Sequence, residues 1–207
     1  MKRTPTLPQL IERLQRFTPD MGGVFSFADL CNLIGAGSDI KNAKVINRLV
    51  RLKVLQRIWR GVYVAGKEPD LWMLGSRIKP DAYVSMDSVL SKNGLVGTIP
   101  RYSVSLVYPG RKTTIETPFG SSLRYFSIQP DLIFGVSTLK NGVKVADSEK
   151  AYLDLIYFYT KGARFVFDPL NEVVLRKLDL KKLKTYLKCY KNPKFVKFVK
   201  GLVNEID

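Results

Sequence analysis

The sequence predicts an α+β protein made of two parts, and three observations lead to this prediction. Residues 26–65 have the pattern of two short helices followed by a two-stranded hairpin. Residues 101–146 contain short runs of alternating apolar side chains, which are typical of strands in a mostly antiparallel sheet. Residues 176–200 form a helical pattern rich in lysine. We therefore expect a small amino-terminal domain, followed by an α/β domain that ends in C-terminal helices.

The amino-terminal part begins with two expected helices. Residues 7–17 place apolar side chains at helical spacing and predict a supporting helix. A second helix is expected over residues 26–34, because Ser26 can cap it and Asp29 complements the positive end of its dipole. Gly35-Ala36-Gly37 should end this helix, since glycine permits a tight turn.

The next helix is expected from Ser38 or Asp39 to about Lys53, and its charged and apolar residues are separated. At about 100° per residue, four basic side chains fall within an arc of about 80°, with Asn47 at its edge. The basic residues are Lys41, Lys44, Arg48 and Arg51, and the residues on the opposite side are Ala43, Ile46, Leu49 and Val50. One face could be buried while the other contacts the phosphates and base edges of DNA.

A hairpin is expected over residues 54–64, with its turn at Trp59-Arg60-Gly61. Arg57 and Arg60 lie on or beside it, where an arginine can reach a phosphate or the minor groove. Trp59 and Tyr63 are expected to pack inward. In this order, the elements predict a winged helix-turn-helix DNA-binding domain over residues 1–66. The alternative is an ordinary amphipathic helix with a solvated basic face.

Composition narrows the classes of function. The chain of 207 residues has a formal net charge of +16 and an isoelectric point near 9.9, which favours binding to nucleic acid. Histidine is absent, which excludes Ser-His and Cys-His catalytic pairs and the commonest zinc ligand. The sequence has no G-x-x-x-x-G-K loop and no apolar run of about 20 residues. Residues 1–5 contain no hydrophobic segment that could act as a signal peptide. We expect a cytoplasmic protein without cofactor, metal or membrane partner, whose Cys31 and Cys189 are free thiols.

The second domain is expected over residues 67–207, after a polar segment that contains Pro69. Its predicted helices cover residues 71–78, 85–93 and 147–159, and its predicted strands cover residues 82–84, 101–108, 113–117 and 123–128. A further hairpin pairs residues 133–137 with 143–146 across Asn141-Gly142, a strong turn signal. The C-terminal segment carries an apolar stripe formed by Phe195, Phe198, Val199, Leu202 and Ile206.

Two charged clusters in this domain allow alternative interpretations. Asp147, Glu149, Lys150 and Asp154 could hold magnesium in a nuclease. However, Glu149 and Lys150 are adjacent at a helix start, whereas restriction-type nucleases need acid-x-Lys on a strand. We therefore predict capping and intramolecular pairing, and no enzymatic activity. The C-terminal lysines are either a solvated face or a surface for more DNA backbone, an acidic partner or an RNA-bearing partner.

Three stretches, taken in order, resemble the AbiEi family of antitoxins from bacterial type IV toxin-antitoxin systems. They are Leu55-Gln-Arg-Ile-Trp-Arg-Gly-Val-Tyr63, Pro80-Asp-Ala-Tyr-Val-Ser85 with the following Asn93-Gly-Leu95, and Val145-Ala-Asp-Ser-Glu-Lys-Ala-Tyr-Leu-Asp-Leu155. The likeness extends over nearly the whole chain. It implies an amino-terminal winged helix that binds inverted repeats in the promoter of its own operon, and a C-terminal antitoxin domain. It implies no catalytic residues.

The resemblance also implies the partners. They are double-stranded promoter DNA, with two copies of the protein on an inverted repeat, and a nucleotidyltransferase-like toxin whose neutralisation does not require a stable complex. The predicted DNA-binding residues are Lys41, Lys44, Asn47, Arg48, Arg51, Arg57 and Arg60. The first alternative is a one-component transcriptional repressor whose C-terminal domain senses a small ligand.

Overall fold

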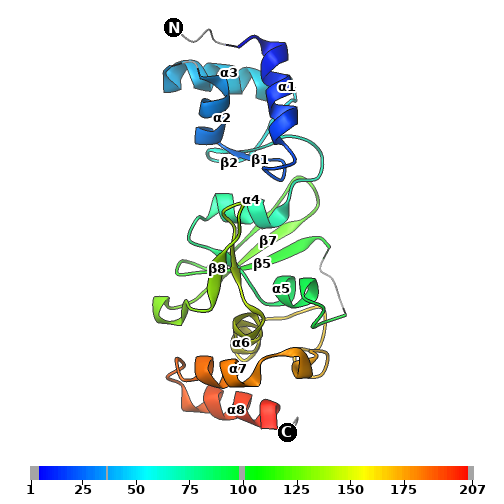
Figure 1. Cartoon of the computed structure of the whole chain (residues 1–207), viewed down its shortest axis with the longest axis vertical. Coiled ribbons are helices and arrows are strands. Elements are labelled where there is room, and N and C mark those ends of the chain that lie inside the picture. Colours follow the sequence, from blue (N-terminus) through cyan, green and yellow to red (C-terminus); the bar gives the residue numbers. More distant parts are fainter. Residues whose placement is uncertain (1–4, 36, 98–100, 205–207) are drawn as a thin grey trace. The chain divides into compact units, whose positions relative to one another are not determined.

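A computed structural model of the chain describes residues 5–35, 37–97 and 101–204, and it is α+β as the sequence predicts (Figure 1). The first unit comprises the described residues up to Pro80 together with Thr117–Phe119, and the second unit comprises the remaining described residues. Parts of three sequence interpretations lie outside the described ranges. These are the amino-terminal residues 1–4, Ala36 in the expected turn, and Ile206 of the apolar stripe.

The first unit combines four helices with a three-stranded antiparallel sheet of order β1-β3-β2 (Figure 1). The helices are α1 (Leu7–Phe17), α2 (Phe27–Ile34), α3 (Asp39–Arg51) and α4 (Leu71–Ile78), and the strands are β1 (Val24–Ser26), β2 (Gln56–Trp59) and β3 (Val62–Val64). Ser26 and Asp29 form the capping box at the start of α2, and Gly35 ends α2 in the left-handed conformation. Both ends of α2 therefore follow from the residues that predicted them.

The core of the first unit brings the three leading helices onto the sheet. The fully or nearly fully buried side chains include Leu14 of α1, Leu30 of α2, Ile46 and Leu49 of α3, and Tyr63 of β3. At about 1.5–3 kcal/mol for each large apolar side chain removed from water, this core is the main stabilising term of the unit. It buries one face of α3 and leaves the other face in solvent.

The first unit extends beyond the boundary that the sequence suggested after Gly66. Helix α4 contacts β1 and β3 and belongs to this unit. Asp70 caps α4 by accepting hydrogen bonds from the backbone amides of Trp72 and Met73. The Asp70 amide in turn donates to the carbonyl of Gly22 at 2.8 Å. The polar segment before α4 is thus held to the first unit by backbone bonds that composition alone does not reveal.

The second unit is built on a six-stranded sheet of order β6-β7-β5-β4-β9-β8. The strands are β4 (Tyr83–Val84), β5 (Ser103–Tyr108), β6 (Thr113–Glu116), β7 (Ser122–Ser127), β8 (Val136–Thr138) and β9 (Lys144–Ala146). Among the described residues, three of the five pairings are antiparallel, and the β5–β7 and β4–β9 pairings are parallel. The hairpin predicted across Asn141-Gly142 is present as the β8–β9 pair.

The order of β5, β6 and β7 corrects the sequence interpretation, which expected these strands to continue one antiparallel sheet. Strand β7 lies between β5 and β6, pairing with β5 in parallel and with β6 antiparallel. Ser105 of β5 is completely buried, and so is Leu123 of β7. The long parallel pairing places β7 inside the sheet, whereas the half-exposed residues of β6 occupy the edge.

Helices α5 (Asp87–Lys92), α6 (Ser148–Tyr159), α7 (Leu180–Leu187) and α8 (Pro193–Asn204) complete the second unit (Figure 1). Two short 3-10 turns, η1 (Pro130–Leu132) and η2 (Leu175–Lys177), lie between these elements. Helix α6 contacts α5 and α7, and most of its side chains are buried. In the described part of the chain, no helix combines the length and apolar character that crossing a membrane requires.

Candidate functional site

The exposed face of α3 carries every residue that the sequence singled out on this helix. Lys41, Lys44, Asn47, Arg48 and Arg51 are all exposed. On the opposite side Ile46 is completely buried, Leu49 is 1% exposed, and Ala43 and Val50 are half-buried. The separation of charged and apolar residues therefore becomes a division between solvent and core.

Helix α3 is fixed at both ends. Ser38 caps its first turn by accepting a hydrogen bond from the Lys41 amide at 3.4 Å. At the other end, the amides of Val54 and Leu55 donate to the carbonyl of Leu49. Because the core fixes the rotation of the helix about its axis, these bonds and the buried residues determine which side chains face outward.

The hairpin of β2 and β3 places two further basic residues in solvent. Arg57 and Arg60 are exposed, and Arg60-Gly61 forms the turn with Gly61 at a φ of +74°. The Gly61 carbonyl accepts a hydrogen bond of 2.8 Å from the amide of Phe27, the first residue of α2. This bond ties the tip of the hairpin to the helix that precedes α3.

The two aromatic residues of the hairpin have different environments. Tyr63 is 6% exposed and belongs to the core, as the sequence predicts. Trp59 is 41% exposed, although it was expected to cover a core of its own. The pairing shifts register between Arg57 and Trp59, which re-aims the side chain of Trp59 at the end of the strand. The exposed tip of the hairpin therefore carries an aromatic ring beside its arginines.

The α3 and hairpin cations have no ion-pair partner in the described part of the chain. Among residues 5–35, 37–97 and 101–204, no acidic side chain forms an ion pair with Lys41, Lys44, Arg48, Arg51 or either hairpin arginine. An anion that approaches this surface does not have to displace an internal partner. We call a set of nine exposed residues the basic face: Ile40, Lys41, Lys44, Asn47, Arg48 and Arg51 of α3, together with Arg57, Trp59 and Arg60.

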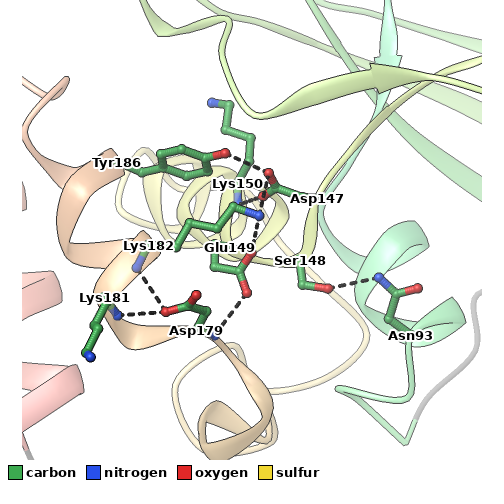
Figure 2. Close-up of polar contacts among 9 residues, drawn as sticks. All are labelled: Asn93, Asp147, Ser148, Glu149, Lys150, Asp179, Lys181, Lys182 and Tyr186. Carbon is green, nitrogen blue, oxygen red and sulfur yellow. Dashed lines mark hydrogen bonds and ion pairs between the residues drawn. The ribbon is translucent and has the colours of Figure 1, made fainter.

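Asp147 and Glu149 of the second unit form internal contacts, which Figure 2 shows. Asp147 caps α6 by accepting from the Lys150 amide, and it also accepts from the Tyr186 hydroxyl at 2.8 Å. Lys182 of α7 pairs with Asp147 at 3.1 Å and with Glu149 at 3.0 Å. The carboxylates raise the pKa of Lys182 against the opposing effect of desolvation. These contacts fasten α7 to the start of α6.

Lys150 and Asp154 lie inside the second unit and form a completely buried ion pair. Their Nζ and Oδ1 atoms are 2.5 Å apart, and both side chains are 0% exposed. Asp154 also accepts from the hydroxyls of Tyr83 at 3.0 Å and Ser85 at 2.8 Å. Burial raises the pKa of Asp154, while Lys150 lowers it. The ammonium lies 4.5 Å from the centre of the Phe134 ring.

The structure thus divides the four residues that invited a nuclease interpretation. Asp147 and Glu149 face α7, whereas Lys150 and Asp154 point into the interior. In the described part of the chain, no group of three or more histidine, cysteine, aspartate or glutamate side chains is arranged to hold a metal ion. The contacts seen are the capping and intramolecular pairing that the sequence predicts.

Comparison with known proteins shows the fold. No protein-family model matches the chain, and no curated protein matches it significantly. The chain is similar to the crystal structure of the RV2827C protein from Mycobacterium tuberculosis, with a TM-score of 0.58. The match covers 99% of this chain and 78% of that chain, with 14% sequence identity. The two proteins therefore share a fold that includes both units of this chain.

Three residues were not found by reasoning from the sequence. Ile40 is 74% exposed on the basic face, and its position inside the exposed arc of α3 was an available signal. Asn42 is 5% exposed on the buried side, where its hydrogen bond to Cys31 lowers the pKa of the thiol against the larger opposing effect of desolvation. Asp87, at the start of α5, is 2% exposed, and burial raises its pKa.

Proposed function

We propose that this protein is a DNA-binding antitoxin of a type IV toxin-antitoxin system, related to the AbiEi family, that represses its own operon. The observation that supports DNA binding best is the basic face, where all seven residues selected from the sequence are exposed. The AbiEi-like stretches 55–63, 80–95 and 145–155 support the antitoxin assignment. In this proposal the first unit is a winged helix-turn-helix, with α3 as recognition helix and β2–β3 as wing.

The residues of α3 have different roles along its length. The amino-terminal end of a recognition helix contacts base edges, so Lys41 and Lys44 read bases in the major groove. Ile40 offers an apolar contact suited to a thymine methyl group. Arg48 and Arg51, later in the helix, hold phosphates, and this positions α3 without reading sequence.

The wing contacts the DNA beside α3. Arg57 and Arg60 reach a phosphate or the adjacent minor groove, and the exposed ring of Trp59 packs on a deoxyribose. Two copies of the protein occupy the two halves of an inverted repeat. The protein acts in the cytoplasm, where the second unit counteracts a nucleotidyltransferase-like toxin without a stable complex and without chemistry of its own.

The DNA-binding part is tested by reversing one charge on α3. Arg48→Glu should weaken affinity for a fluorescent duplex from the upstream region of the gene at least about tenfold, measured by anisotropy, because it replaces a phosphate contact with repulsion. The matched control is Lys140→Glu, an exposed position on the β8–β9 turn that changes the net charge equally. Equal losses in the two variants would mean that net charge, and not α3, determines binding.

The antitoxin part is tested by co-expression of the full-length chain with the neighbouring gene from unrelated promoters. We expect the neighbouring gene to stop growth and the wild-type chain to restore it. Arg48→Glu should restore growth equally well, because the proposal assigns neutralisation to the second unit. Loss of rescue in this variant would refute that division of roles, and a harmless neighbouring gene would favour a one-component repressor.

A further inference from the structure

Helix α8 has an exposed face that combines lysines with an aromatic ring. At about 100° per residue, Lys194 and Lys197 lie about 60° apart on the exposed side of the helix, with Phe198 at one edge of that side and Lys200 at the other. The three lysines are exposed, and Phe198 is 38% exposed. The sequence placed Phe198 in the apolar stripe, so its exposure corrects that interpretation. We call these four residues the α8 face.

The opposite side of α8 is firmly packed in the second unit. Phe195 is 5% exposed, Val199 is completely buried and Val203 is 1% exposed. The Phe195 ring lies 4.7 Å from the Tyr190 ring and 5.5 Å from the Tyr157 ring, measured between centres. A helix that lies on a membrane directs its apolar side to the lipid, whereas α8 directs that side to the protein core. The α8 face is therefore presented to an aqueous partner.

The charges of the α8 face have no acidic partner among the described residues. Among the residues that the structure describes, no acidic side chain pairs with Lys194, Lys197 or Lys200. By contrast, Lys182 of α7 is held by two carboxylates and Lys191 pairs with Asp131 at 3.0 Å. Some lysines of the second unit thus form internal ion pairs, whereas these three are exposed to solvent and can attract an external anion.

The surroundings of Phe198 leave its exposed surface accessible. Lys194 lies one turn before it, and Gly201 follows it at helical spacing. Among the described residues, a Cβ atom added at Gly201 would meet no atom within 4 Å, so there is open space beside this position. A flat ligand can approach the ring from this side, where Lys194 lies beside it.

We propose that the α8 face binds single-stranded RNA, with Lys194 and Lys197 contacting phosphates and Phe198 stacking on an unpaired base. Lysine is a point charge on a flexible stem, which suits phosphate contacts that do not read sequence. An aromatic ring gains from contact with the face of a base, and a duplex hides that face inside its stack. An acidic protein would use the lysines but not the ring.

This inference does not depend on the proposed antitoxin function, because its residues are on α8 and not on the basic face. The test uses the full chain and a fluorescent oligouridine of about 12 nucleotides, within the site size of common single-strand binders. Lys194→Glu/Lys197→Glu should weaken binding at least about tenfold. It should also reduce the magnitude of the slope of log affinity against log salt concentration by about 1.4. Phe198→Leu, which keeps apolar bulk, should weaken binding about fivefold.

Controls separate this site from general charge and from the basic face. Arg111→Glu/Lys140→Glu reverses two exposed charges elsewhere in the second unit and should leave oligouridine affinity within about twofold. Arg48→Glu should also leave it unchanged while weakening duplex binding. Far-ultraviolet circular dichroism and thermal unfolding identify any variant that is not folded. If the double variant does not fold, single substitutions at Lys197 or Phe198 replace it, because both side chains are exposed and their substitution should leave the fold intact.

Three results would overturn the proposal. The first is unchanged oligouridine affinity in folded variants of the α8 face. The second is competition by polyglutamate as effective as competition by unlabelled oligouridine at equal charge, which would assign the face to an acidic protein. The third is displacement of labelled oligouridine by an oligothymidine or a duplex at a concentration about tenfold lower than unlabelled oligouridine requires, which would assign the α8 face to DNA.

Discussion

Replacing Asp154 by asparagine tests the most deeply buried charge in the protein. Asparagine has nearly the same shape, and its amide oxygen can still accept the hydrogen bonds of Tyr83 and Ser85. Its NH2 group takes the place of the oxygen that accepts from Lys150, so the change removes the negative charge and the acceptor of the ammonium. It leaves the Lys150 ammonium 0% exposed and without its counter-charge. Breaking a buried ion pair in this way costs about 3–5 kcal/mol.

A second variant isolates the electrostatic part of that cost. In Lys150→Met/Asp154→Asn the buried cation is also removed, while methionine fills similar volume beside Phe134. Replacing both members of a buried pair is often close to neutral, so we expect this variant to recover at least about half of the lost stability. Lys182→Met, which breaks a half-exposed pair on α7, should cost about 1 kcal/mol or less.

Urea and thermal unfolding, followed by circular dichroism, measure these differences. At roughly 2–4 °C per kcal/mol for a chain of this size, Asp154→Asn should lower the midpoint of thermal unfolding by about 10 °C. If Asp154→Asn and the double variant are equally unstable, the cost does not come from an uncompensated charge. The assignment of Lys150 and Asp154 as a buried ion pair would then be refuted.

Three further predictions concern charge. If all six cations of the basic face contact phosphates, the slope of log duplex affinity against log potassium chloride concentration has a magnitude of at most about 5. Arg57→Gln should reduce this magnitude by about 0.9 in an anisotropy titration. Burial raises the pKa of Asp87, so its carboxyl contributes stability that is present below its unfolded-state pKa and lost as pH rises through its folded-state pKa. The free energy of unfolding in urea, measured relative to Asp87→Asn, should therefore fall between acidic and neutral pH. A difference that stays constant with pH would refute this. Labelled DNA incubated with the protein and magnesium should stay intact on a gel, because Asp147 and Glu149 are engaged by Lys182, and magnesium-dependent cleavage would revive the nuclease interpretation.

The sequence predicts local structure well where periodicity and turn chemistry agree. Ser26 and Gly35 determine the ends of α2, and Asn141-Gly142 joins β8 to β9. The exposed side of α3 also follows from spacing, because a helix that buries Ile46 must expose residues on the opposite side. Each of these features depends on residues close in the chain.

The features that the sequence did not predict depend on contacts between distant residues. The alternation of β7 fits either neighbour, and only the assembled sheet places it in parallel beside β5. Lys150 and Asp154 have the spacing of an exposed helical pair, but the sheet and the C-terminal helices cover them. Phe198 has the spacing of a core residue, but Phe195 packs against the Tyr190 ring and Phe198 remains 38% exposed.

The fastening of α7 to α6 bears on how the protein resists proteolysis. Lysine-rich segments offer many peptide bonds to trypsin-like enzymes, which require an extended backbone for cleavage. Here Glu149 accepts a hydrogen bond of 3.0 Å from the Asp179 amide and its carboxylate also holds Lys182, so the backbone at the start of α7 must detach from an interior helix before it can enter a protease. The start of the lysine-rich α7 is thereby held against the core, and we expect proteolysis of the folded chain to begin outside this segment.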